Sequence, residues 1–212
     1  MNNTYAEIVK ATINIHDKMN IDCDIPSQLK IISKKSPLQT LEKAIDSYSR
    51  ENMKTRLDIS VKYLDFFTLQ AYGIYLNFSV NSDTNRIKIL INTNRGNRCW
   101  ERYVAAKELS HVLMGEDEKT HTKDIVVLIS DLLSEVDFVK SKIKDIIETE
   151  YLSLILALEL LVPYCYNHLL IDDSLTSLEI ANIFQVPEKI IDFMKKENYQ
   201  ELRIKTYTEV KK

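Results

Sequence analysis

The segment from Lys107 to His111 carries the residues of this chain whose types and spacing best suit metal chemistry. Positions four apart on an α-helix differ in direction by about 40°, so Lys107 and His111 share a face. Glu108 lies about 100° round the helix from Lys107, close enough to reach a ligand held on that face. With histidine at both ends, as His-Glu-x-x-His, this spacing lets two imidazoles bind zinc while the glutamate polarises the zinc-bound water. The segment therefore has the spacing of a zinc peptidase motif, with lysine in the first position.

The lysine changes what this segment can do. A protonated amine has three donors and no lone pair, so Lys107 cannot ligate a cation in its usual form and repels one. We expect zinc to bind weakly or not at all, and we expect Lys107 and Glu108 to form an ion pair. The plain alternative is that Glu-x-x-His is a chance pattern, with His111 packed among neighbours and Glu108 a solvated charge.

Other residues suited to metal or nucleophilic chemistry are scattered. His121 lies in the charged segment 115–124, expected to be an exposed loop, and is a candidate substitute ligand. His16 and His168 are isolated, so structural roles are expected for both. Cys99 precedes the motif and is expected to be a free buried thiol; a position at a helix start could activate it, but no base is identifiable beside it.

The cysteine content favours a reducing compartment. The chain has 3 cysteines, Cys23, Cys99 and Cys165, and their odd number and spacing fit neither a disulfide framework nor a CxxC metal site. Disulfides are rare in the cytoplasm, so their expected absence predicts a cytoplasmic location. The N-terminus shows no basic segment followed by an apolar one, so no signal peptide is expected.

Length and composition indicate an ordinary globular protein. The chain has 212 residues, of which 45% are hydrophobic and 28% charged, enough for one large domain or one with a small appendage. Its net charge of -3 gives no global attraction to nucleic acid or anionic membranes. The most apolar run, 152–162, is shorter than the roughly 20 residues of a membrane span and is interrupted by Glu159. We expect it to be a buried core helix.

Hydrophobic periodicity predicts a mostly helical chain with a short β region. Segments 72–80 and 86–91 are expected to form a β-hairpin around the polar turn 81–85, whereas 58–68 is ambiguous because it satisfies the strand period and the helix period only partly. An apolar stripe at Tyr5, Ile8, Val9, Ile13 and Ile15 predicts the first helix, and a second helix is expected after Ser27. Further helices are expected at 41–48, 98–114 (closed by Gly115), 125–138 and 143–161 (stopped by Pro163).

The region after residue 175 is expected to form a helix-turn-helix. Thr176 to Glu179 has the sequence of a capping box, which opens a short helix. Gln185 to Pro187 breaks it, and the last helix is expected at 188–197. Because that helix carries mixed charge and no Arg, Asn or Gln at its start, we expect it to pack against the body rather than to read bases.

The segment 100–113, placed after a hairpin and a polar loop, resembles the motif helix of the ImmA/IrrE family of zincin metallopeptidases, R-F-x-x-A-H-E-L-G-H-x-L. Arg102 and Tyr103 stand for its Arg-Phe, and the alanine, the Glu-Leu pair and the second histidine match. Lys107 replaces the first histidine and Ser110 replaces the glycine.

Two further matches follow in the same order. Residues 157–163 resemble the family's A-A-E-L-L-M-P helix end, and 177–187 resemble its closing segment E-L-A-x-x-F-x-V-S. The family's third metal ligand, a glutamate shortly before that helix end, falls at 152–153, which are Leu and Ser. Glu150 is a nearby carboxylate that reaches the site only after a shift. The resemblance runs from about residue 72 to 194.

The resemblance implies an α+β fold, a mostly helical zincin-like domain with a small antiparallel sheet and a C-terminal helix-turn-helix. It divides the chain into a helical N-terminal region at 1–70, a zincin-like core at 71–165 and a C-terminal helical segment at 166–212, in one compact unit. With two of three ligands missing, the site is expected to be vestigial. Its expected members are Glu108 and His111 as remnants, with Lys107, Glu150 and His121 around the former cleft.

The family's members relieve repression by acting on helix-turn-helix repressors, so the resemblance implies a protein partner of that kind, from a phage or mobile element. We expect a regulator without peptidase activity or cofactor that acts through protein contacts, with no membrane or nucleic-acid partner. Two alternatives stay open. One is an active zinc peptidase with ligands drawn from His111, Glu108 or Glu150, and His121 or a neutral Lys107. The other is a DNA-binding regulator that uses the C-terminal helices.

Overall fold

The computed structural model describes residues 2–19, 21, 36–65, 72–93, 98–113, 120–122 and 145–211. Within them the chain is a mixed α+β protein, as the sequence predicted. The elements, in order, are α1 (Asn2–Lys18), α3 (Ser36–Asn52), β1 (Arg56–Leu64), β2 (Gly73–Asn81), β3 (Thr84–Asn92), α4 (Arg98–Leu113), β4 (Thr120–Thr122), α6 (Asp145–Leu161), η2 (Tyr164–Tyr166), α7 (Asn167–Leu170), α8 (Ser177–Phe184), α9 (Glu188–Met194) and α10 (Glu197–Val210).

The described strands form one sheet in the order β1-β3-β2-β4. The expected hairpin is present: β2 and β3 pair antiparallel, and the side chain of Asn81 accepts a hydrogen bond from the backbone N–H of Asp83 at the turn. The expectation of a purely antiparallel sheet is wrong, because β1 pairs parallel with β3 along its whole length. The ambiguous segment 58–68 therefore contributes a strand over 58–64, and its apolar residues of period two face the helices.

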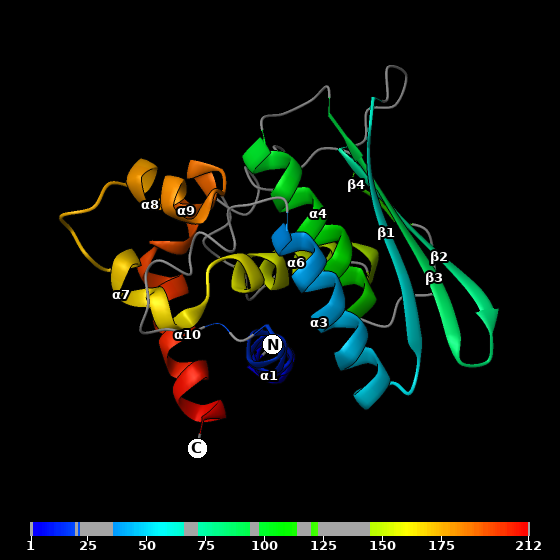
Figure 1. Cartoon of the computed structure of the whole chain (residues 1–212). Helices are drawn as coiled ribbons and strands as arrows, with labels where there is room; N and C mark the ends of the chain where they lie inside the picture. The colour runs from blue at the N-terminus through cyan, green and yellow to red at the C-terminus, as the bar shows by residue number, and fades with distance from the viewer. Residues whose placement is uncertain are drawn as a thin grey trace.

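The helices lie on one face of this sheet (Figure 1). Helix α4 packs against β2 and β3, α3 packs beside it against β1, and α6 packs on the other side of α4. The C-terminal helices α7 to α10 lie at the end of the molecule away from the sheet. One continuous hydrophobic core runs from α1 and α3 through the sheet, α4 and α6 to the C-terminal helices. Helix α4 is thus enclosed between the sheet and α6.

The structure tests several of the element boundaries that the sequence predicted. Helix α6 ends at Leu161, two residues before Pro163, as expected. The segment 115–124 was expected to be a loop, but its described part, Thr120–Thr122, is a strand that pairs with the edge of β2. The helices expected after Ser27 and at 125–138 lie outside the described residues, as does Gly115.

The described chain after residue 175 contains one more helix than expected. The capping box is present, because Thr176 accepts from the N–H of Glu179, and Gln185 ends α8 in the left-handed region with φ 53°. The helix expected at 188–197 ends at Met194, and α10 follows from Glu197. No glycine or proline marks this break; Lys196 takes an extended conformation before α10.

Two further findings bear on the sequence expectations. Among the described residues, no single helix is long and apolar enough to span a membrane, although the bent pair 151–161 and 164–170 meets the length and composition criteria when taken together. Cys99 is a free thiol, as expected, whereas Cys165 is disulfide-bonded. The expectation that the cysteines form no disulfide is therefore wrong, since pairing depends on the proximity of the folded chain rather than on spacing in the sequence.

Candidate functional site

The expected motif helix is α4, and its site face is closed to solvent. Lys107, Glu108 and His111 all have fully buried side chains with an exposed fraction of 0%. The helix buries ten of its residues in a row from Tyr103 to Val112, because the sheet covers one side and α6 the other. A solvated Glu108, as in the chance-pattern alternative, is therefore excluded.

The expected ion pair between Lys107 and Glu108 is present. The Nζ atom of Lys107 lies 3.4 Å from Oε1 of Glu108, and both side chains are fully buried. Burying either charge alone would cost several kcal/mol, about 3–5 by analogy with broken buried pairs, so each side chain compensates the other. Both residues, and His111, also make at least one further interaction. The amine thus stands at the position of the first histidine of the zinc motif, already neutralised by the carboxylate beside it.

Strand β2 packs directly on this face of α4. The ring of His111 lies against the ring of Tyr75, with centroids 5.6 Å apart. Gly73 lies over Glu108: a Cβ atom added at Gly73 would come within 2.9 Å of Oε1 of Glu108 and 2.5 Å of Cγ1 of Val104. Glycine is required at this position by the close approach of strand and helix. The absence of a side chain there is what lets Glu108 be buried under the sheet.

We expect Gly73→Ala to lower the free energy of unfolding by about 1–3 kcal/mol, the usual cost of overpacking a filled core. The added methyl group must displace Val104 and the Glu108 carboxylate, because both lie closer than van der Waals contact allows. Urea denaturation monitored by circular dichroism measures the change. Ser79→Ala, at an exposed position of the same strand, is the control and should be neutral. Equal effects of the two substitutions would contradict the packing described here.

The remaining expected site residues are placed only by their backbones. His121 lies on β4 opposite Ile74 of β2, so its backbone is next to the strand that covers Glu108 and His111. Glu150 lies in the first part of α6, the helix packed against α4. Their side chains are outside the described part of the structure. At the third ligand position of the resemblance, Ser153 is fully buried and Leu152 is partly buried.

The described residues do not assemble a metal centre around His111. No group of three or more His, Cys, Asp or Glu side chains with the geometry to hold a metal ion occurs among them. Lys107 does not fit the role of a zinc ligand, because its amine is engaged with Glu108 and carries no free lone pair when protonated. A zinc site at this helix would need Lys107 to give up this ion pair. The residues present therefore fit the zincin metal poorly.

A second buried polar cluster, which sequence reasoning missed, surrounds Glu159. Its carboxylate accepts hydrogen bonds from three tyrosine hydroxyls and from Nε of Arg203, with donor–acceptor distances between 2.6 and 3.1 Å. The tyrosines are Tyr5 of α1 and Tyr199 and Tyr207 of α10. Glu159 and Arg203 are fully buried. The signal in the sequence was a lone glutamate inside the most apolar run of the chain.

Arg203 extends this cluster to the end of α6. Its Nη1 donates to the side chain of Asn167 and its Nη2 donates to the backbone oxygen of Val162 at 2.5 Å. Burial alone would lower the pKa of Arg203, but Glu159 and the tyrosines raise it above its usual value, so the guanidinium stays charged. Burial and the charge of Glu159 raise the pKa of Tyr199 well above its usual value, so this hydroxyl keeps its proton. Each guanidinium nitrogen and each of the three tyrosine hydroxyls donates within the cluster, which indicates a structural clamp between α1, α6 and α10.

His16 has the structural role expected of it, whereas His168 is exposed and makes one local hydrogen bond. Nε2 of His16 lies 3.1 Å from the backbone oxygen of Leu160, and burial lowers the pKa of His16 to about 4. The imidazole is therefore neutral at neutral pH and donates to that carbonyl near the end of α6. Nδ1 of His168 lies 3.2 Å from the backbone oxygen of Cys165, in the next turn of chain.

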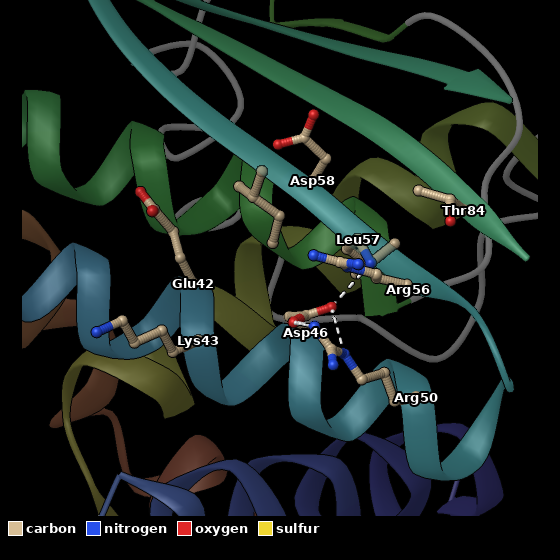
Figure 2. Close-up of a pocket in the computed structure, with 9 residues that line it drawn as sticks. Glu42, Lys43, Asp46, Arg50, Arg56, Leu57, Asp58 and Thr84 are labelled. Carbon is tan, nitrogen blue, oxygen red and sulfur yellow. Dashed lines mark hydrogen bonds and ion pairs between the residues drawn. The ribbon is translucent and has the colours of Figure 1, made fainter. Parts of the chain in front are cut away.

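A surface groove of about 500 Å³ lies between α3 and β1 (Figure 2). Its polar side chains have mixed charge: Asp46 of α3 binds Arg50 of the same helix and accepts a hydrogen bond of 2.8 Å from the backbone N–H of Leu57. Partial burial raises the pKa of Glu42, which extends from α3 toward the strand. None of the expected site residues lines this groove, so it is separate from the face of α4 that carries Lys107, Glu108 and His111.

Comparison with models of known protein families gives no match, and no curated protein matches the sequence.

Proposed function

We propose that this chain is a zincin-like regulatory protein of the ImmA/IrrE type that neither binds zinc nor cleaves peptides and acts through protein contacts. The observation that carries the proposal is the buried ion pair of Lys107 and Glu108. In a working site of this type the glutamate polarises a zinc-bound water. Here that glutamate neutralises a lysine instead, so the motif helix is stabilised without a metal.

Three further features support the same proposal. The motif helix, the Leu-Val-Pro helix end and the tail segment occur in the order that the resemblance requires. The position of the third ligand holds Leu152 and Ser153 rather than a carboxylate. Gly73 packs against Glu108, and Tyr75 packs against His111. Both of the packed α4 side chains are therefore fully buried and present no surface to a substrate.

The partner that the resemblance implies is a helix-turn-helix repressor of a phage or mobile element. In this proposal the chain binds the repressor and does not cleave it. The C-terminal pair α8 and α9 has the place of the expected helix-turn-helix, but α9 buries Ile190, Ile191, Phe193 and Met194. That burial favours packing against the body over insertion into a DNA groove.

A cytoplasmic location is part of this proposal, since such repressors act in the cytoplasm. The disulfide at Cys165 argues against that location, because disulfides are rare in the cytoplasm. Alkylation of the cysteines before and after reduction, read by mass spectrometry, decides between a reducing and an oxidising compartment. A Cys165 thiol that is alkylated only after reduction would speak for an oxidising compartment.

Metal analysis tests the proposal directly. Protein purified without chelator should contain far less than one equivalent of zinc per chain, because an ammonium group stands where the first ligand is needed. Lys107→His rebuilds the two-histidine motif on one helix face and should raise the zinc content of the purified protein. Lys107→His/His111→Ala, which keeps one histidine, is the matched control and should lose that gain. Stoichiometric zinc in the unaltered chain that disappears in His111→Ala would overturn the proposal.

A repressor assay tests the second half of the proposal. A helix-turn-helix repressor from the same organism that binds this chain should remain intact after incubation, as judged by mass spectrometry. A cleavage product formed by the unaltered chain and not by Glu108→Gln would show an active peptidase.

A further inference from the structure

Among the described strands, β1 forms one edge of the sheet, and the hydrogen bonds that it makes to β3 show which of its backbone groups point away from the sheet. The N–H of Arg56 donates to Asp83, and the C=O of Leu64 accepts from Thr93, so the even-numbered residues of β1 bond toward β3. The backbone groups of odd-numbered residues 57, 59, 61 and 63 must therefore point outward, because they alternate along a strand.

This outward row is largely unpaired. The N–H of Leu57 is bonded to Asp46 of α3, but no hydrogen bond joins the outward groups of Ile59, Val61 or Tyr63 to another described residue. The strand pairs with β3 over nine consecutive positions without a bulge, and it contains neither proline nor glycine. Proline, bulges and short length, three of the devices that prevent edge pairing, are absent from β1; a fourth device, charged side chains, is present as Arg56, Asp58 and Lys62.

The sequence of β1 is complementary to itself. An antiparallel pairing of two copies centred on Ser60 places Ile59 opposite Val61 and Leu57 opposite Tyr63, twice each by symmetry. These are the outward residues, as a hydrogen-bonded antiparallel pair requires; because the N–H of Leu57 already donates to Asp46, the inter-copy hydrogen bonds come mainly from the Ile59–Val61 pairs. On the exposed face of the sheet the same register places Asp58 opposite Lys62, again twice.

The groove between α3 and β1 fits this register. Tyr63 has an exposed fraction of 45%, and the register brings it beside Leu57 of the second copy, which lines the groove. Residues opposite one another across two antiparallel strands project to the same face, so Tyr63 would approach the α3 side of the neighbouring strand. Figure 2 shows that side, where Leu57 lies next to Asp46 and Arg50.

From these observations we propose that β1 is a dimer interface: two copies of this chain pair β1 with β1 in antiparallel register about Ser60 and continue the sheet across a two-fold axis. The occupant of the edge is a second copy, because opposite charges and β-branched pairs then meet on both halves. Moving the centre to residue 59 would instead bring Arg56 opposite Lys62, two like charges. The proposal is independent of the proposed function at α4.

Analytical ultracentrifugation over a concentration series tests the interface. The unaltered chain should show a monomer–dimer equilibrium. Val61→Pro removes an N–H that points outward and is not needed within the sheet, so the monomer should keep its fold while the dimer is lost. Circular dichroism and thermal unfolding of the variant check that the fold is kept.

A charge swap fixes the register. Lys62→Asp places Asp58 opposite an aspartate twice and should raise the dimer Kd by about tenfold. Asp58→Lys/Lys62→Asp reverses both partners and should return the Kd to within about threefold of the unaltered chain. The double variant also loses the exposed Arg86–Asp58 pair within one copy, which contributes little to stability.

Three outcomes would overturn the proposal. A monomer at every concentration would show that the edge does not pair two copies, and the edge would then be free for an extended segment of another protein. A dimer unchanged by Val61→Pro and Lys62→Asp would place the interface elsewhere. A dimer weakened by Lys62→Asp but not restored by the double variant would reject the register about Ser60.

Discussion

Arg203→Met is expected to lower the free energy of unfolding by about 3–5 kcal/mol, the typical loss when one member of a buried ion pair is removed. The substitution keeps a long apolar side chain but removes the bonds of Nε to Glu159 and of the guanidinium to Asn167 and to the oxygen of Val162. The carboxylate of Glu159 then stays buried with tyrosine hydroxyls but without a positive charge. Urea denaturation at neutral pH measures the loss.

Two further variants distinguish the effect of losing the buried pair from the effect of removing any positive charge from α10. Lys205→Met removes an exposed charge from the same helix and should change stability by less than about 0.5 kcal/mol. Arg203→Met/Glu159→Gln removes both buried charges, and it should be less destabilised than the sum of the two single variants. A loss in Arg203→Met no larger than in Lys205→Met would mean that the clamp between α6 and α10 contributes nothing.

This cluster also shows where sequence reasoning reached its limit. Glu159 was visible as the one charge in an apolar run, and the run was correctly expected to be a buried helix. Its partners come from both ends of the chain: Tyr5 is 154 positions away and Arg203 is 44 positions away. No local pattern connects such residues, because a folded core brings them together. The same holds for the parallel pairing of β1 with β3, which passes over β2 in sequence.

Structures that depend on residues close together in the sequence, by contrast, were predicted correctly. The capping box at Thr176 involves only residues three apart, so its two hydrogen bonds could be predicted from side-chain chemistry. The hairpin of β2 and β3 follows from a polar turn between two strand-forming segments. The break between α9 and α10 had no such marker, and the last helix was therefore predicted to continue to Glu197 when it ends at Met194.

The candidate site lies between these two cases. The shared face of Lys107 and His111 follows from helix geometry, and the ion pair of Lys107 with Glu108 follows from their opposite charges once both are buried. The closure of the site does not, because it depends on Gly73 and Tyr75 of a strand more than thirty residues earlier in the sequence. A glycine at a strand start with a tyrosine two residues later gives no sign of which helix the strand will cover.

Glu108→Gln is expected to lower the free energy of unfolding by about 3–5 kcal/mol, because it leaves the Lys107 ammonium buried without its carboxylate. Lys107→Met leaves the opposite charge behind and should cost a similar amount. In Lys107→Met/Glu108→Gln neither charge remains, so the loss should be well below the sum of the two single losses. Urea denaturation of the three variants gives the coupling between the two residues.

The exposed pair of Lys10 and Glu7 provides the comparison, because its side chains are 57% and 70% exposed and the two atoms are 2.8 Å apart. Glu7→Gln should change stability by no more than about 0.5 kcal/mol, as for exposed helix pairs. Strictly additive losses at Lys107 and Glu108 would show that each is held by other contacts and that the lysine does not compensate the glutamate. Strong coupling means that a metal entering this site must first break a buried ion pair, so the same contact that stabilises α4 opposes zinc binding.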